Sequence, residues 1–374
     1  MTTITAPDNR VSADVDARLT ALLEKVVARR GIHHANLAVA SGDGTRHWAG
    51  AAGAAGPQRT PLTPETPFFI ASITKRFIIT LVLQAHERGE LHLDDPVTRH
   101  LPADVTDGLH VRKGTDHTAG ITLRHLASHT AGLPDHFEKP REGPSLFAQL
   151  AAGNDRAWGF EDVVRMAKED HRPHFPPQDL TADRQRARYS DAGFQLLIRI
   201  AEVATGRSYG ELLTERIIAP LGLQHTWLPG RSAPAVPTPE ASRLYAKDRP
   251  LDLPRMIESC NDLISTTGDL LRFQRALLAG ELFADPVTVG LLTERENRLR
   301  NAPVLRYGLG TMLFRVNRLS APGTHPVWLV GHSGSTGTWL FRCPELDVHL
   351  TGTVDQAEGR SLPFRLMAHL LRAW

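Results

Sequence analysis

Cysteine is scarce in this sequence, long apolar runs are missing, and neither sign of charge dominates. The cysteines are Cys260 and Cys343 alone, and we expect two separate buried thiols rather than a disulfide. The longest apolar stretch, Phe77 to Leu83, is far shorter than the ~20 residues of a membrane-spanning helix. Lysine and arginine total 43 against 41 aspartates and glutamates, which excludes a strongly basic surface for nucleic acid.

The N-terminal residues also lack the basic and apolar segments of a secretory signal. We therefore expect a cytoplasmic protein that acts on a small molecule and has no membrane or nucleic-acid partner. Its 374 residues, with 41% hydrophobic and 22% charged side chains, are typical of a globular chain with two or three structural units.

The order of the predicted elements indicates a discontinuous α/β unit with an inserted helical unit. Hydrophobic periodicity predicts helices near the N-terminus, over about 72–88, and over 362–371. Strand-like segments flank the Asp-Gly turn in 41–44 and return after residue 300, over 307–317, 327–330, 338–343 and 348–354. Residues 1–100 and 251–374 are assigned to the α/β unit. Residues 101–250 form an all-α unit with polar loops, its clearest helices spanning 161–168, 192–204 and 208–218.

The segment Ser72-Ile73-Thr74-Lys75 is the first candidate for chemistry. Residues at i and i+3 share one face of a helix, so the lysine lies beside the serine hydroxyl. Serine is a weak nucleophile unless a base or a positive charge activates it. Taken alone the pattern is also compatible with a helix-capping serine and a solvated lysine.

Two later motifs favour the catalytic interpretation of Ser72 and Lys75 over the helix-capping one. Tyr189-Ser190-Asp191 precedes a helix, and Gly331-His332-Ser333-Gly334-Ser335 stands at the start of a predicted strand. Three motifs in this order resemble the serine β-lactamase and penicillin-recognising family, in particular its class C-like branch of esterases and D-amino-acid peptidases. The resemblance implies a β-lactamase-like fold, an antiparallel sheet flanked by helices with an inserted helical domain.

The resemblance also implies the roles of individual residues. Ser72 is the nucleophile that forms an acyl-enzyme, Lys75 activates it, and Tyr189 is the partner in proton transfer. The backbone N–H groups of Ser72 and Ser335 form the oxyanion hole. The expected substrate-binding residues are Asp191, His332, Ser333 and Gly334. No cofactor and no metal are expected, since His125 and His129 have no evident third ligand.

Two departures from the family pattern bear on the substrate. Asp191 stands where asparagine is usual, and an ionised carboxylate only accepts hydrogen bonds. We expect it to hold Lys75 as an ammonium and leave Tyr189 as the base, unless Asp191 merely caps the following helix. His332 stands where many members have lysine, and a neutral histidine holds a carboxylate less firmly, unless it only orients the strands. Both departures favour a neutral acyl ester over a carboxylate-bearing lactam.

Two further departures have no assigned role. Asn261-Asp262 replaces the glycines that the family usually shows before Leu263. The segment 176–188 is longer than the usual loop, and its arginines Arg184, Arg186 and Arg188 either rim the pocket or belong to a solvated loop.

The sequence thus predicts a serine hydrolase or acyltransferase, an esterase, amidase or transacylase for a small ester or a biosynthetic intermediate. A β-lactamase or D-specific peptidase of the same fold, and a non-catalytic scaffold, are the alternatives. The sequence predicts no oligomeric state.

Overall fold

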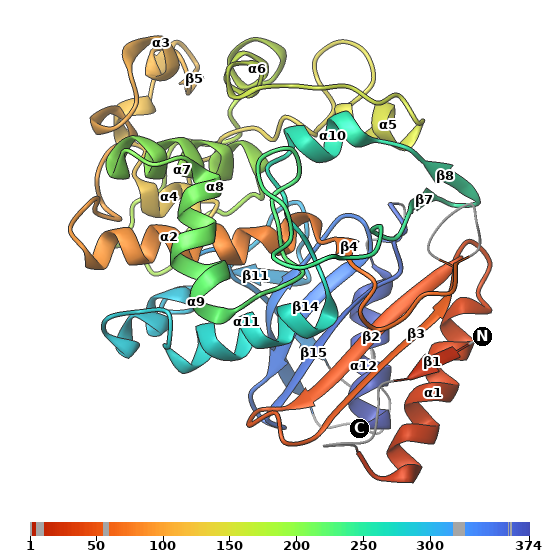
Figure 1. Ribbon diagram of the computed structural model, residues 1–374. Coiled ribbons are helices and arrows are strands. Elements are labelled where there is room, and N and C mark those ends of the chain that lie inside the picture. Colours follow the sequence, from red (N-terminus) through yellow and green to blue (C-terminus); the bar gives the residue numbers. More distant parts are fainter. Residues whose placement is uncertain (1, 5–10, 55–59, 317–325, 358, 360) are drawn as a thin grey trace.

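The computed structural model describes residues 2–4, 11–54, 60–316, 326–357, 359 and 361–374, and its centre is a nine-stranded sheet (Figure 1). Every neighbouring pair of strands is antiparallel, in the order β1-β3-β2-β15-β14-β13-β12-β11-β10. The strands are β1 (Thr2–Ile4), β2 (His34–Ser41), β3 (His47–Gly53), β10 (Asn297–Arg298), β11 (Leu305–Tyr307), β12 (Met312–Val316), β13 (Val327–Ser333), β14 (Thr338–Cys343) and β15 (Val348–Thr353). The predicted hairpin is β2 and β3, and it joins the C-terminal strands through β15, as in the register pair Val39 and Leu350.

Helices cover both faces of this sheet. Helices α1 (Ala13–Val27) and α12 (Leu362–Ala373) pack on one face, and α11 (Thr267–Ala279) packs on the other (Figure 1). The alternation along β14 decides which side chain meets which layer. Trp339 and Phe341 join the core with α1 and α12, whereas Leu340 joins the core with α11.

The helical part of the molecule is built around α2 (Thr74–Glu87). The apolar run from Phe77 to Leu83 forms its centre and is buried, and Phe77 stacks on Phe273 of α11 at 3.7 Å between ring centroids. Around α2 lie α4 (Leu123–Ala127), α7 (Asp191–Thr205) and α8 (Tyr209–Leu213). One hydrophobic core therefore runs from the helices at 101–250 to the sheet.

Short elements complete this part of the chain. They are helices α3 (Ala103–Thr106), α5 (Leu146–Ala151), α6 (Phe160–Arg165), α9 (Ala219–Leu221) and α10 (Pro254–Ser259), and strands β4 (Phe68–Phe69), β5 (Val111–Arg112), β6 (Thr115–Asp116), β7 (Leu244–Ala246), β8 (Arg249–Leu251) and β9 (Ile264–Ser265). The pairs β5–β6 and β7–β8 are two-stranded antiparallel ribbons. The expectation that residues 101–250 form an all-α unit is therefore corrected, because this part of the chain also contains strands.

Some element boundaries in the structure differ from the predicted ones. The expected strand 307–317 divides into β11 and β12, because Gly310 takes φ +52° and a Cβ there would lie 2.6 Å from Ile79. The expected helices 161–168 and 208–218 each change into a π-helical turn, at Met166–Asp170 and Thr214–Ile218.

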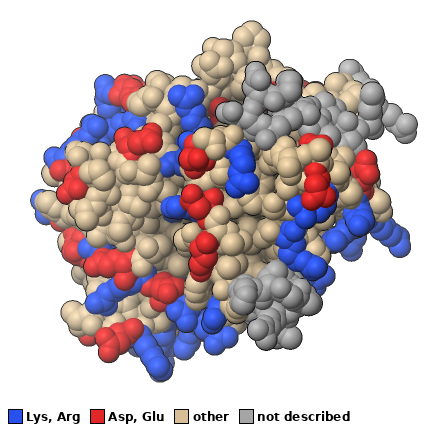
Figure 2. Space-filling model, turned by 90° about the horizontal axis from the view of Figure 1, so that it is seen from below, with Lys and Arg blue, Asp and Glu red and all other residues tan. Residues whose placement is uncertain are grey.

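Among the described residues both cysteines are free and buried, as expected, and no helix is long and apolar enough to cross a bilayer. Figure 2 shows lysines and arginines interspersed with aspartates and glutamates over the lower face of the molecule, and the described residues of that face form no large area of one sign.

Candidate active site

Ser72 lies in a 3₁₀ turn, Ala71–Ile73, directly before α2 rather than within the helix. The amine of Lys75, in the first turn of α2, donates a hydrogen bond to Ser72 Oγ at 3.3 Å. Ala71 has φ +48°, a left-handed conformation that is unfavourable for alanine. The neighbouring backbone holds this turn in place, because Ile70 N–H donates to Leu263 C=O and Thr338 Oγ1 donates to Ile70 C=O.

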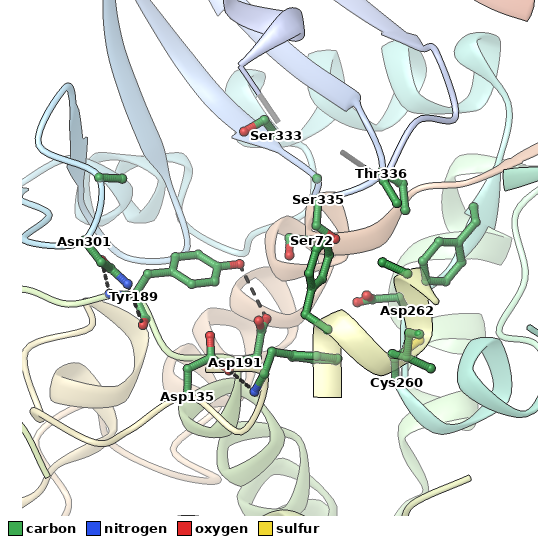
Figure 3. Close-up of a pocket in the computed structure, with 18 of the residues that line it drawn as sticks. Ser72, Asp135, Tyr189, Asp191, Cys260, Asp262, Asn301, Ser333, Ser335 and Thr336 are labelled. Atoms are coloured by element: carbon green, nitrogen blue, oxygen red, sulfur yellow. Dashed lines mark hydrogen bonds between the residues drawn. The ribbon is translucent and has the colours of Figure 1, made fainter. Parts of the chain in front are cut away.

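Residues of the second motif meet this turn from the start of α7. Asp191, the first residue of α7, forms a buried ion pair with Lys75, 116 positions away in the chain. The hydroxyl of Tyr189 donates to Asp191 Oδ1 at 3.5 Å, and Asn301 pairs with the backbone of Tyr189 (Figure 3). The structure therefore brings Ser72, Lys75, Tyr189 and Asp191 together.

Charge is distributed unequally within this group. Burial by itself would lower the pKa of Lys75, but the Asp191 carboxylate in contact with it, with Asp262 nearby, raises that pKa above its usual value. Burial likewise opposes ionisation of Asp191, and the Lys75 ammonium still keeps the pKa of this carboxyl below its usual value. Lys75 is therefore an ammonium and Asp191 a carboxylate, as expected from the sequence.

Tyr189 behaves differently from the expectation. Burial, together with the adjacent Asp191 carboxylate, raises the pKa of the phenol well above 10, although a hydrogen bond with Ser72 opposes this effect. A phenol with so high a pKa is a poor base near neutral pH, so the structure does not support the expectation that Tyr189 itself is the base. Tyr189 is thus a neutral phenol.

The third motif ends a strand instead of starting one. Ser333 is the last residue of β13, and residues 334–337 make the tight turn into β14, where Gly334 N–H donates to Thr338 C=O at 2.8 Å. Ser333, Gly334 and Ser335 all line the same pocket as Ser72. The backbone N–H of Ser335 has no acceptor among the described residues, so it is available to a ligand.

His332 is placed differently from the prediction. Its side chain is 0% exposed and does not line the pocket. Successive side chains of a strand point to opposite faces of the sheet, so the side chain of His332 lies on the face opposite to that of Ser333, which lines the pocket. Tyr307 donates its hydroxyl proton to His332 Nε2 at 2.8 Å, and Nδ1–H donates to Ser333 C=O at 2.9 Å. Burial and the Lys75 charge lower the pKa of His332 to about 3, so it is neutral. The expectation that His332 contacts the substrate is therefore corrected. His332 instead fixes β13 beneath the site through its hydrogen bonds to Tyr307 and to the Ser333 carbonyl.

The long segment before Tyr189 contributes only indirectly. Arg188 forms an ion pair at 2.6 Å with Glu138, which lines the pocket and also contacts His174. Arg184 and Arg186 are exposed and do not line the pocket. His125, weighed above as a metal ligand, bonds Thr122 and the Gln178 carbonyl through its two ring nitrogens.

Gly334 packs against the turn that carries Ser72. A Cβ at this position would lie 2.2 Å from Thr338 Oγ1 and 2.8 Å from Ala71 Cβ. We expect Gly334→Ala to move the Ser335 N–H away from the Ser72 turn and lower kcat about 100-fold, the scale for loss of one oxyanion donor. Steady-state kinetics with an activated ester measure this. Gly290→Ala, at a glycine whose φ is not positive either and where a Cβ would meet no atom within 4 Å, is the control and should keep full activity. Equal rates for the two variants would contradict this assignment.

The pocket over Ser72 has a volume of about 580 Å³. Most of its wall is apolar, with Phe69, Phe137, Phe147, Leu150, Leu251, Leu253 and Met256 among the lining residues. Four carboxyl side chains, those of Asp135, Glu138, Asp191 and Asp262, also line it, and no described lysine or arginine does. Sequence reasoning missed Asp135 and Asn301, which lie outside the three motifs, and left Asp262 without a role.

A serine beside a buried lysine, facing the turn after a sheet strand, defines the class of β-lactamase-fold hydrolases. The sequence profile of the Beta-lactamase family matches residues 19–371, and the chain belongs to this family. It is similar to penicillin-binding protein 4* of Bacillus subtilis, with 26% identity over 275 residues, 68% of this chain and 54% of that protein. The chain thus spans about half the length of that relative.

Solved structures show the same fold. A D-stereospecific amidohydrolase from Streptomyces sp. is 27% identical with a TM-score of 0.72, and the match covers 95% of this chain and 98% of that one. EstCE1, a hydrolase with promiscuous acyltransferase activity, has a TM-score of 0.72 at 20% identity and the same coverage.

Proposed function

We propose that this protein is a serine hydrolase or acyltransferase that forms an acyl-enzyme on Ser72, and that it acts on small esters or amides. The observation that carries this proposal is the Lys75 amine, 3.3 Å from a serine hydroxyl that lines a 580 Å³ pocket. A scaffold without catalysis has no need of a buried ammonium at this place, since burying charge costs free energy.

The contacts support the following route for the serine proton. As Ser72 Oγ bonds to the carbonyl carbon, its proton passes to the Tyr189 oxygen, and the Tyr189 proton passes to the Asp191 carboxylate. Asp191 is then the base, Tyr189 stays a phenol, and the Lys75 ammonium stabilises the negative charge that develops beside it. The backbone N–H groups of Ser72 and Ser335 bind the oxyanion.

The second half of the reaction uses the same groups in reverse. Protonated Asp191 returns its proton through Tyr189 to the leaving oxygen or nitrogen as the carbonyl–leaving group bond breaks. Water, or an acceptor alcohol or amine, then attacks the acyl-enzyme and passes its proton along the same route, which releases Ser72. The acceptor decides whether the outcome is hydrolysis or acyl transfer.

The pocket favours acyl groups without a carboxylate. Its walls are apolar, its described charged lining groups are carboxyls, and His332 is neutral and buried. An anionic lactam or peptide would find no cationic partner among the described lining residues and would lie beside carboxyl groups. A D-specific amidase is the second candidate for the function, and the likeness to the Streptomyces amidohydrolase favours it.

The cytoplasmic location and the small-molecule substrate both stay predictions.

Intact-mass spectrometry tests the proposal directly. We expect a fluorophosphonate to add one covalent group that maps to Ser72, and p-nitrophenyl esters to be turned over faster than a chromogenic β-lactam. A chain labelled at another residue, or not labelled at all, would contradict the proposed function. Faster turnover of the lactam would show that the preferred substrates are β-lactams and not esters.

Replacing Asp191 by asparagine tests the proton route. An asparagine cannot take a proton, so turnover then needs the neutral amine of Lys75, whose pKa also falls without the carboxylate. On an uncharged ester we expect kcat/KM of Asp191→Asn to rise with pH along an acidic limb at least about two pH units above that of the native enzyme. An acidic limb at the same pH in both proteins would exclude Asp191 as the base.

A further inference from the structure

Asp262 occupies a place in the pocket that the proposed proton route does not use. It lies between α10 and β9, in the Asn261-Asp262 pair that stands in place of the family's usual glycines. Asn261 keeps the left-handed backbone such a position needs, at φ +60°, and its side chain donates to Gln195 Oε1 at 2.6 Å, away from Ser72. The carboxyl of Asp262 instead lines the pocket, across Ser72 from Tyr189 in Figure 3.

This carboxyl has no cation of its own. The single lysine near it, Lys75, is already paired with Asp191, and no described lysine, arginine or histidine lies within 4 Å of the Asp262 oxygens. Burial and the neighbouring Asp191 raise the pKa of Asp262 to about 7, although Lys75 and the Thr74 hydroxyl favour its charged form. A positive group that entered the pocket would therefore ionise Asp262 fully and pair with it.

The position of Asp262 also limits where that positive group lies in the substrate. Asp262 and Ser72 line the same pocket, where Figure 3 shows the Asp262 carboxyl beside Ser72, and the Lys75 amine contacts Ser72 Oγ. A cation that pairs with Asp262 thus sits close to the carbonyl carbon bound at Ser72. An amine one or two carbons from the reacting carbonyl meets this condition.

We propose that Asp262 binds a protonated amine next to the reacting carbonyl, so that the preferred substrates are esters or amides of amino acids with a free amino group and an apolar side chain. This inference rests on the proposed function, because it needs the carbonyl to be bound at Ser72. The apolar walls around Phe69 and Phe137 receive the side chain, and Asp262 selects the ammonium.

The experiment compares substrates that differ in the amine alone. The ethyl esters of D- and L-phenylalanine are measured beside the ethyl ester of 3-phenylpropionic acid, which has the same skeleton without the amine. We expect the native enzyme to favour the better phenylalanine ester by about 10- to 100-fold in kcat/KM, the range for a charge-assisted hydrogen bond. We expect Asp262→Asn to reduce this preference to less than about threefold while its rate on the 3-phenylpropionate ester stays within about threefold of native.

Two further variants make the result specific. Asp262→Gly, which restores the residue type usual in the family, should lose the preference in the same way. Asp252→Asn removes one carboxylate at an exposed position near the same segment and should keep the preference. The 3-phenylpropionate rate reports in each variant that the protein is folded.

The possible results separate the two proposals. If the native enzyme turns over the 3-phenylpropionate ester through Ser72 but shows no preference for an amine, or if Asp262→Asn keeps that preference, the role of Asp262 is overturned and the proposed function stands. If no ester is turned over and Ser72 is not labelled, both proposals fall.

Discussion

Ser72→Ala is expected to abolish acyl-enzyme formation and to lower kcat by at least about 10⁴-fold, because no other described hydroxyl accepts a hydrogen bond from the Lys75 amine. The substitution removes one oxygen whose described side-chain contacts are with Lys75 and Tyr189, so the free energy of unfolding should change by less than about 1 kcal/mol. Mass spectrometry measures acyl-enzyme formation, ester kinetics measure kcat, and urea unfolding measures the free energy of unfolding.

Ser12→Ala is the matched control for this variant. Ser12 caps α1, where its side chain accepts a hydrogen bond from Val15 N–H, and it lies outside the pocket. Its loss should cost about 1 kcal/mol of stability and leave the ester rate unchanged. A Ser72→Ala protein that still becomes acylated would show that another residue is the nucleophile.

Lys75→Met is expected to be both inactive and strongly destabilised. Methionine keeps most of the volume of the lysine stem but leaves the Asp191 carboxylate buried and unpaired, close to Asp135 and Asp262. Loss of one partner of a buried ion pair costs about 3–5 kcal/mol, and we expect about 3 kcal/mol here because Asp191 is 20% exposed. Activity should fall at least about 10³-fold.

The double variant Lys75→Met/Asp191→Asn separates the charge from the packing. It removes the stranded carboxylate, so it should recover at least half of the lost stability while remaining inactive. Equilibrium unfolding of the native protein, both single variants and the double variant gives the coupling energy. A double variant as unstable as the sum of the single variants would mean that the pair contributes no coupling.

The same ion pair sets a pH window for stability. The folded pKa of Lys75 is raised, so its contribution is complete below the unfolded value of about 10.4 and is lost as pH rises past the folded value. The folded pKa of Asp191 is lowered, so its contribution is complete above about pH 4 and is lost as pH falls. The pair therefore stabilises the fold fully between about pH 4 and 10, and the double variant lacks this dependence.

Local sequence patterns predicted much of the fold. The Asp-Gly turn predicted the β2–β3 hairpin, hydrophobic periodicity over about 72–88 predicted α2, and the helix expected over 208–218 begins with α8. Predictions failed where a contact with a distant element decided the outcome. Gly310 broke a predicted strand because Ile79 of α2 lies against it, and the face on which the His332 side chain lies depended on the register of β13.

The sequence by itself determined that a serine and a lysine share one face at the start of a helix, because i and i+3 spacing is a local property of the chain. It also identified the tyrosine and aspartate of the second motif as their partners, through the family resemblance. Only the tertiary structure decided the charges, because they depend on desolvation and on neighbours far apart in the chain: Asp191 on α7 holds Lys75 as an ammonium, Tyr189 stays a phenol, and Asp262 faces the pocket without a cation.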